Sequence, residues 1–331
     1  MLENLGIFKD NNDGTLKCTF KENNKNIIEM SLLMNREDTD VVCVPTHHFC
    51  NLGCKMCHLT NNSLNKAMVP INIDSFVESL KRTVCNQTTG KRRTNKRILL
   101  LSFMGVGEPL LNIKLISDIY DLQEKLKKEL DYDYIGYALA TMIPSEQLFF
   151  QLKETVLKKH IPLKIHFSLH TPINENRQDL IPSTNVSVEN AMKLLDDYNN
   201  QIKKDEKIMK IYKSFHSTID VVEIHYTLIN NVNDGEKELN KIIQLLKEYN
   251  FTIKFINFNP KEELVGSNKL TYWQNVIRRN TLSRVKFYCP PGKEVGSSCG
   301  EFTKHYYHEE IETLEQKEEF EKWYKSHIIY D

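Results

Sequence analysis

Short apolar runs alternate with longer amphipathic stretches along most of this chain. From residue 41 onward, six runs rich in β-branched and aromatic residues predict strands: "VVCVPTH", "RILLLSFMG", "YIGYALAT", "LKIHFSLH", "VVEIHYTLI" and "FTIKFINFN". Between these runs, apolar residues at helical spacing predict helices at about 72–84, 112–129, 145–159, 187–200 and 234–249. Strict alternation of strand and helix indicates βαβ units and a parallel sheet. Six units are too few for a closed eight-stranded barrel, so we expect an α/β fold with an open, partial (β/α)6 barrel.

The two ends of the chain break this alternation. Near the start, "DGTLKCTFKENNKNIIEMSLLM" holds two alternating segments around a polar turn, which predicts a β-hairpin. The Lys-rich stretch 200–215 is interpreted as an exposed connection, and the charged tail "HEEIETLEQKEEFEKWYKSH" as a solvated helix. We therefore expect a hairpin extension at 1–40, a barrel with a following loop at 41–305, and a helix at 306–331.

Composition narrows the class of protein without identifying a partner. The chain has 331 residues, of which 40% are hydrophobic, and its 44 basic residues balance 44 acidic ones. No apolar run approaches the ~20 residues of a membrane span, and the start lacks the apolar stretch of a signal peptide. We expect a soluble, monomeric protein of the cytoplasm that does not act at a membrane. In that compartment the eight cysteines are expected to be ligands, catalysts or core residues rather than a disulfide framework.

Three of those cysteines, Cys50, Cys54 and Cys57, lie in the spacing C-x3-C-x2-C directly after the first predicted strand. Buried core cysteines do not suit a segment that also carries Asn, Gly, Lys and His. Zinc would need a fourth ligand, for which His47, His48 and His58 are candidates. A [4Fe–4S] cluster held by three thiolates would leave one iron open to a second molecule. This spacing at the end of a first barrel strand is typical of radical S-adenosylmethionine (SAM) enzymes, although Met56 stands where an aromatic residue is usual.

Other polar motifs end the later strands of the predicted barrel. Gly105, Gly107 and Glu108 follow the second strand, and the glycines would let the backbone approach a ligand while Glu108 binds the amino group of SAM. "FSLH" ends the fourth strand and "FNFNP" the sixth. The carboxyl ends of parallel strands share one rim, where active sites of αβ barrels form. We expect the cofactor-binding residues there: Gly107, Glu108, Thr141, Ser168, Leu169, His170 and Asn259.

Over about residues 12–302 the sequence resembles the radical SAM RNA methyltransferases of the RlmN/Cfr family. The resemblance rests on "CVPTHHFCNLGCKMC", "FMGVGEPLLN", "SLHTPINENRQDLIP", "VNDG", "FNP" and "GKEVGSSCGEF". It implies a [4Fe–4S] cluster on Cys50, Cys54 and Cys57, and two SAM molecules per turnover. Cys43 and Cys299 match the family's two further cysteines. From the residues alone, Cys43 would be a buried core residue at a strand start.

The resemblance also implies a mechanism. Cys299 would take a methyl group from one SAM, and a radical made from a second SAM would activate that group for addition to an adenine carbon. Cys43 would resolve the adduct and form a disulfide with Cys299, which an external thiol must reduce. Glu29 lies near the position of an acidic proton acceptor of the family. A flavodoxin- or ferredoxin-like donor would reduce the cluster. Cys18, Cys85 and Cys289 match nothing in the family pattern and are interpreted as structural.

The resemblance implies rRNA or tRNA as the substrate, modified on adenine carbon 2 or less readily carbon 8. Ala140 stands where the family carries a SAM-contacting serine. Only about a dozen residues precede the hairpin, so the family's N-terminal helical accessory domain has no counterpart. The loop "KRTVCNQTTGKRRTNKR" offers basic residues for RNA phosphates, or is a plain solvated loop. Two alternatives stay open: the same chemistry on a small molecule or peptide, and a non-catalytic metal-binding module.

Overall fold

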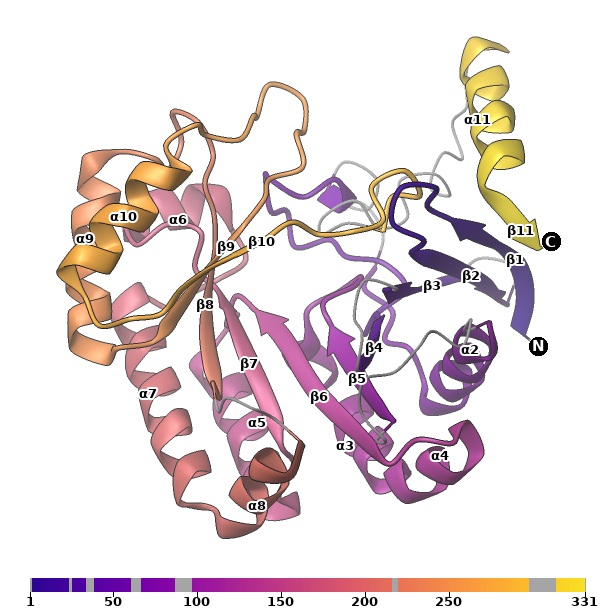
Figure 1. Ribbon diagram of the computed structural model, residues 1–331, viewed down its shortest axis with the longest axis horizontal. Helices are drawn as coiled ribbons and strands as arrows, with labels where there is room; N and C mark the ends of the chain where they lie inside the picture. The colour runs from indigo at the N-terminus through magenta and orange to yellow at the C-terminus, as the bar shows by residue number, and fades with distance from the viewer. Residues whose placement is uncertain are drawn as a thin grey trace.

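A single open sheet organises the protein. The computed structural model describes residues 2–23, 26–33, 39–60, 67–86, 97–215, 220–297 and 314–330. Its sheet has 11 strands in the order β10-β9-β8-β7-β6-β5-β4-β3-β2-β1-β11 (Figure 1). The chain is thus a mixed α/β protein with a long parallel region and an antiparallel extension.

Seven parallel strands form the barrel-like part of the sheet. All six expected strands are present, and β10, which the sequence reading missed, extends the row by one. The prediction of six strands was therefore one short. The parallel strands are β4 (Thr39–Cys43), β5 (Ile98–Phe103), β6 (Tyr134–Thr141), β7 (Leu163–Ser168), β8 (Val222–Thr227), β9 (Thr252–Ile256) and β10 (Val285–Tyr288).

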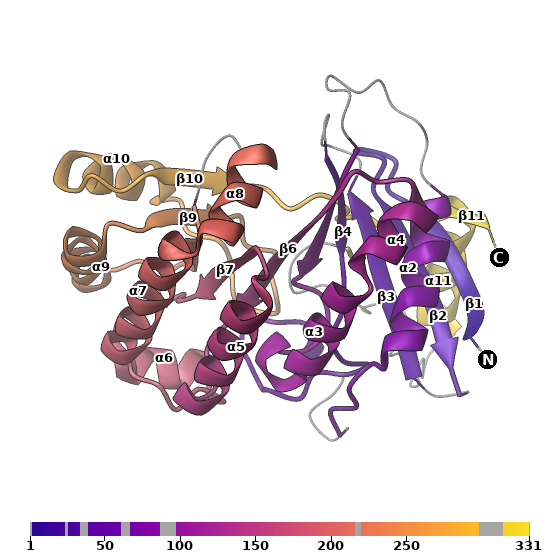
Figure 2. The same ribbon diagram turned by 90° about the horizontal axis from the view of Figure 1, so that it is seen from below.

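Helices connect successive parallel strands and cover the outer face of the curved sheet (Figure 2). The expected helices are present, except that the one expected at 112–129 is three consecutive pieces. The helices that follow the strands are α2 (Ile73–Cys85), η1 (Pro109–Asn112), α3 (Ile113–Asp121), α4 (Gln123–Leu130), α5 (Glu146–Lys159), α6 (Asn174–Leu180), α7 (Val188–Lys204), α8 (Glu206–Phe215), α9 (Glu236–Tyr249) and α10 (Leu270–Asn280). None of the described helices combines the length and apolar content needed to cross a lipid bilayer.

The starts of these helices follow ordinary capping chemistry. The side chains of Asn72, Ser145 and Ser187 each accept a hydrogen bond from a backbone N–H in the first turn of α2, α5 and α7. The interpretation of 200–215 as an exposed connection was wrong. The segment is helical because Ile208 and Tyr212, one turn apart, are buried and anchor α8.

The N-terminal part is larger than the expected hairpin. β2 (Leu16–Glu22) and β3 (Asn26–Leu33) pair antiparallel as expected, but β1 (Leu2–Lys9) adds a third strand that the sequence reading missed. After α11 (Leu314–His327), β11 (Ile328–Tyr330) pairs with β1. The two ends of the described chain therefore lie side by side (Figure 1).

Candidate functional site

One pocket lies at the carboxyl ends of the parallel strands, where the sequence predicted a site. It is lined by residues in or just after the carboxyl ends of five strands and by the loop after β4. The predicted residues found in its lining are Cys50, Cys54, Cys57, Gly107, Glu108, Thr141, Ser168, His170 and Asn259. The topology of a parallel sheet brings them together, since every strand ends at the same rim.

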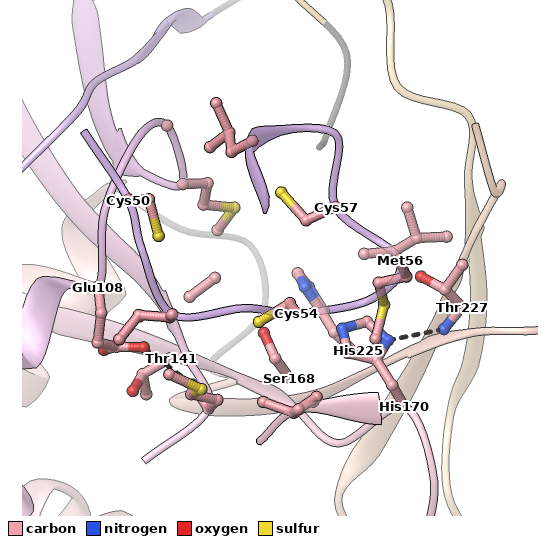
Figure 3. A pocket seen from close by; sticks show the side chains of 18 of the residues that line it. Cys50, Cys54, Met56, Cys57, Glu108, Thr141, Ser168, His170, His225 and Thr227 are labelled. Atoms are coloured by element: carbon pink, nitrogen blue, oxygen red, sulfur yellow. Dashed lines mark hydrogen bonds between the residues drawn. The ribbon is translucent and has the colours of Figure 1, made fainter. Parts of the chain in front are cut away.

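The three thiols of the loop after β4 lie around a common space (Figure 3). Several hydrogen bonds hold this loop against the barrel: Ser183 Oγ donates to the carbonyl of Leu52 at 2.6 Å, and Lys261 Nζ donates to that of Lys55 at 3.0 Å. Burial, with repulsion from Cys57, raises the pKa of Cys50 to about 12, and burial also raises the pKa of Cys54. Thiols this close cannot ionise together without a cation to offset their charge.

Glu108 lines the pocket and is buried. Its two carboxylate oxygens accept backbone N–H groups from Leu110 at 3.1 Å and Met142 at 3.2 Å, and Thr141 adds a side-chain hydrogen bond. Burial nevertheless raises the pKa of Glu108 to about 7. A ligand ammonium group in the pocket would favour the ionised carboxylate and be held by it.

Gly107, beside Glu108, has a backbone conformation that only glycine adopts readily. Its φ is +104°, and a Cβ there would lie 2.5 Å from His47 Nδ1 and 2.7 Å from Thr46 Oγ1. The close neighbours of Gly107 are thus residues of the loop after β4, and the expected approach of its backbone to a ligand stays a prediction.

His170 presents a defined tautomer to the pocket. Its Nδ1 accepts a hydrogen bond of 3.1 Å from the backbone N–H of Thr227 (Figure 3). Burial, with help from the nearby Arg177 charge, lowers the pKa of His170 to about 3. The neutral ring therefore carries its proton on Nε2 and can donate it. Leu169, by contrast, is buried in the core and absent from the pocket lining.

Arg177 supports the rim and was missed as a site residue, although it stands inside a quoted motif. The side chain is buried and lies over the ring of Phe167 at 5.1 Å. Its guanidinium donates to the carbonyls of Met142 at 2.9 Å, Ser168 at 3.2 Å and Leu169 at 3.2 Å. It thereby joins the ends of β6 and β7. The sequence contains one indication that Arg177 is buried, because this arginine stands three residues before the apolar run "LIP".

The residues expected to do covalent or proton chemistry are Cys43, Cys299 and Glu29, and of these Cys43 lies close to the three thiols of the loop after β4. Cys43 is buried at the end of β4, in a small apolar cluster against which Cys50 and Cys57 pack. Glu29 is not in the pocket lining; it forms a buried ion pair of 3.2 Å with Lys17. Because Ser31 pairs with Cys43, alternation places Glu29 on the same sheet face, two residues along β3. Cys299 lies outside the described residues.

The donor set fits an iron–sulfur cluster held from one side. Three thiols face one space, and two of the three histidines considered as zinc ligands have other partners: His47 pairs with Thr46 at 2.9 Å and His48 with Glu22 at 3.0 Å. No disulfide joins any two of the seven described cysteines, and Cys299 lies outside the described residues. The transient disulfide between Cys43 and Cys299 therefore remains a prediction.

Comparison with known proteins agrees with this geometry. No protein-family model matches the chain. The chain is 25% identical over 294 residues to a probable dual-specificity RNA methyltransferase RlmN from Finegoldia magna, covering 87% of this chain and 74% of that protein. It is 26% identical to the corresponding protein of Clostridioides difficile, covering 89% and 77%. The solved structure of a radical SAM methyltransferase from Sphaerobacter thermophilus matches with a TM-score of 0.71 at 17% identity, covering 91% of this chain and 80% of that one.

The fold and the cysteine-bearing rim are therefore similar to those of radical SAM proteins, a class that implies SAM and a [4Fe–4S] cluster. Within that class, the chain is a distant homologue of the RlmN dual-specificity RNA methyltransferases.

Proposed function

We propose that this protein is a radical SAM methyltransferase that modifies an adenosine of rRNA or tRNA, at carbon 2 rather than carbon 8. One observation carries the proposal: the three thiols, Glu108 and His170 line a single pocket, and Cys43 packs beside two of those thiols. The relatives' described activity supports the choice of RNA.

Each rim residue has a role that its surroundings support. Cys50, Cys54 and Cys57 would hold the cluster. Glu108 would bind the amino group of SAM. Thr141 orients the Glu108 carboxylate through a hydrogen bond while accepting one of 2.9 Å from the N–H of Ile143.

The opposite wall of the pocket supplies neutral polar groups. His170 Nε2–H and the amide of the buried Asn259 would hydrogen-bond oxygen or nitrogen atoms of the SAM nucleoside, with Ser168 beside them. When bound, the cluster and SAM together supply a radical able to abstract a hydrogen atom.

The thiol pair carries the group transfer. An aromatic adenine carbon is a poor nucleophile, so the thiolate of Cys299 would first accept the methyl group, because sulfur is a far better one. After hydrogen abstraction, the methylene carbon on Cys299 bonds to the ring. The ring adduct would then lose its extra electron to the electron acceptor that the bound cluster supplies and its ring proton to Cys43. Attack of the Cys43 sulfur on the Cys299 sulfur would break the bond from Cys299 to the methylene carbon, which takes up a proton and becomes the methyl group of the released base, and the two sulfurs remain as a disulfide. An external thiol restores them.

The experiment is turnover with an isotopically labelled methyl donor. Reconstituted, reduced enzyme is incubated with deuterated SAM and total rRNA or tRNA, and nucleosides are analysed by mass spectrometry. A labelled methyladenosine is expected. Absence of any labelled nucleoside from enzyme that cleaves SAM would refute RNA as the substrate.

The role of Cys43 has its own test. Cys43→Ala is expected to accumulate a covalent enzyme–RNA species that survives denaturation, because the adduct cannot be resolved. Cys18→Ala is the matched control, since Cys18 is also buried but lies on β2 and is absent from the pocket lining. Normal turnover by Cys43→Ala would remove this residue from the mechanism.

A further inference from the structure

A second group of charged side chains lies on the inner face of the barrel, away from the cysteines. In β7, β8 and β9, polar residues alternate with buried apolar ones, and Lys286 of β10 pairs with Lys254 of β9, so the polar set shares one face. The members of this inner cluster are Lys164, His166, Glu223, His225, Lys254 and Lys286.

Glu223 is the centre of the inner cluster. Its carboxylate is 2.8 Å from Lys164 Nζ and 2.8 Å from Lys254 Nζ, and it also pairs with Lys286. The Glu223 side chain is 1% exposed, whereas those of the lysines are 20–30% exposed. The ammonium groups therefore reach from a buried carboxylate into open space.

The charges of this cluster do not balance among the described residues. Lys286 also pairs with Asp220 at 2.9 Å, and Asp220 in turn pairs with Arg284 at 3.0 Å. Three lysines and one arginine thus face two carboxylates, which leaves two positive charges uncompensated. Two of the lysines, Lys254 and Lys286, are directly opposite each other on neighbouring strands, an unfavourable arrangement that the shared Glu223 carboxylate offsets by a single negative charge.

The histidines add no charge to this surplus. Burial lowers the pKa of His166 to about 3 and that of His225 well below its usual value. The Nε2 atom of His225 is buried without a hydrogen-bond partner among the described residues. An unpaired ring nitrogen of this kind is costly unless a ligand or water satisfies it.

The inner cluster lines a cavity of about 620 Å³. That volume is within the range of small-molecule sites. Its walls include the aromatic side chains of Tyr288 and Phe287. The cavity meets the cysteine pocket, since Met104, His225 and Ile256 line both.

A metal ion is the competing occupant. His166, Glu223 and His225 place ligand atoms within 4.8 Å of one another, as a two-histidine, one-carboxylate site would require. However, three ammonium groups already pair with the same carboxylate, and they would repel a divalent cation. The same three groups favour an anion with several acceptor oxygens.

We propose that the inner cavity binds a phosphate group, held by Lys164, Lys254 and Lys286. The phosphate belongs either to a small nucleotide or to the backbone of an RNA that enters the barrel. This site is additional to the proposed methyl transfer and does not depend on it, because binding can be measured without SAM and without turnover.

The test is calorimetric titration of the full chain in phosphate-free buffer. Inorganic phosphate is expected to bind at one site, and Lys254→Met and Lys286→Met are each expected to raise its dissociation constant at least about tenfold, the effect of losing one charge-assisted hydrogen bond. Lys159→Met is the matched control: Lys159 is 28% exposed and paired with Asp121, but outside the cavity. It should leave phosphate binding unchanged.

Further arms separate the possible ligands. Tighter binding of AMP than of phosphate, with no binding of adenosine, assigns the site to a nucleotide; displacement of phosphate by an RNA oligomer assigns it to RNA. Both support the site. The proposal is overturned if the wild-type protein binds zinc but not millimolar phosphate. It is also overturned if Lys286→Met and Lys159→Met bind phosphate with the same dissociation constant. The wild-type arms decide the question even if a variant fails to fold.

Discussion

Gly107→Ala is expected to damage both the stability of the protein and the proposed SAM site. The added Cβ would lie 2.5 Å from His47 Nδ1 and 2.7 Å from Thr46 Oγ1, on a residue whose φ is +104°. Non-bonded heavy atoms prefer separations of about 3.5 Å or more. The loop before the cysteines, or the segment that carries Glu108, must therefore move by about 1 Å.

The magnitude follows from two contributions. A non-glycine residue in this region of φ costs about 1–3 kcal/mol. Moving His47 also breaks its 2.9 Å hydrogen bond with Thr46, which contributes about 1 kcal/mol. We expect the free energy of unfolding to fall by about 2–4 kcal/mol.

The assay is guanidinium unfolding followed by circular dichroism, together with SAM binding to the reconstituted protein. Gly266→Ala is the control, because its Cβ would meet only Phe258 Cβ, at 3.8 Å. That variant should stay within about 1 kcal/mol of wild type. If Gly107→Ala unfolds at the same guanidinium concentration as Gly266→Ala and binds SAM normally, the close approach at Gly107 does not constrain the site.

Three further changes probe the cysteine-bearing site and the inner cluster. Arg177→Met should lower the free energy of unfolding by about 3–5 kcal/mol, because it leaves buried carbonyls without donors; a loss below about 1 kcal/mol in chemical denaturation would contradict this. Cys54→Ser should abolish the broad absorption near ~400 nm that thiolate-held iron–sulfur clusters show, while Cys85→Ser, at an exposed position, should retain it. Burial lowers the pKa of His166 from 6.5 to about 3, so only the unfolded state takes up this proton between those pH values. The free energy of unfolding should therefore fall as pH drops below 6.5, and in His166→Gln the dependence should be shallower by up to about 1.4 kcal/mol per pH unit; identical pH profiles would refute it.

Sequence patterning predicted the parallel strands well, because each is a compact apolar run that ends in a polar motif. It failed where structure depends on distant partners. The segment "LENLGIFK" has little periodicity of its own and is a strand because β2 and β11 pair with it. Likewise, α8 is encoded by only two buried residues among lysines, so its composition resembled a solvated connection.

The rim residues were predictable because their motifs follow strand ends, and strand ends share one edge. The inner cluster was not predicted, although the sequence contained an indication of it. A parallel strand buried on both faces should be almost wholly apolar. "LKIHFS" and "VEIHYT" instead alternate charged and apolar residues, which requires a polar interior. The sequence does not determine the register of β7 against β8, and it is this register that pairs Glu223 with His166.

The pairing of β11 with β1 has a consequence for synthesis of the protein. During synthesis, the outer edge of β1 has no partner strand until residues 328–330 have left the ribosome. An unpaired strand edge of this kind readily forms hydrogen bonds with strands of neighbouring nascent chains. Deleting the last residues should therefore reduce the yield of correctly folded protein in cells more than it weakens the finished molecule.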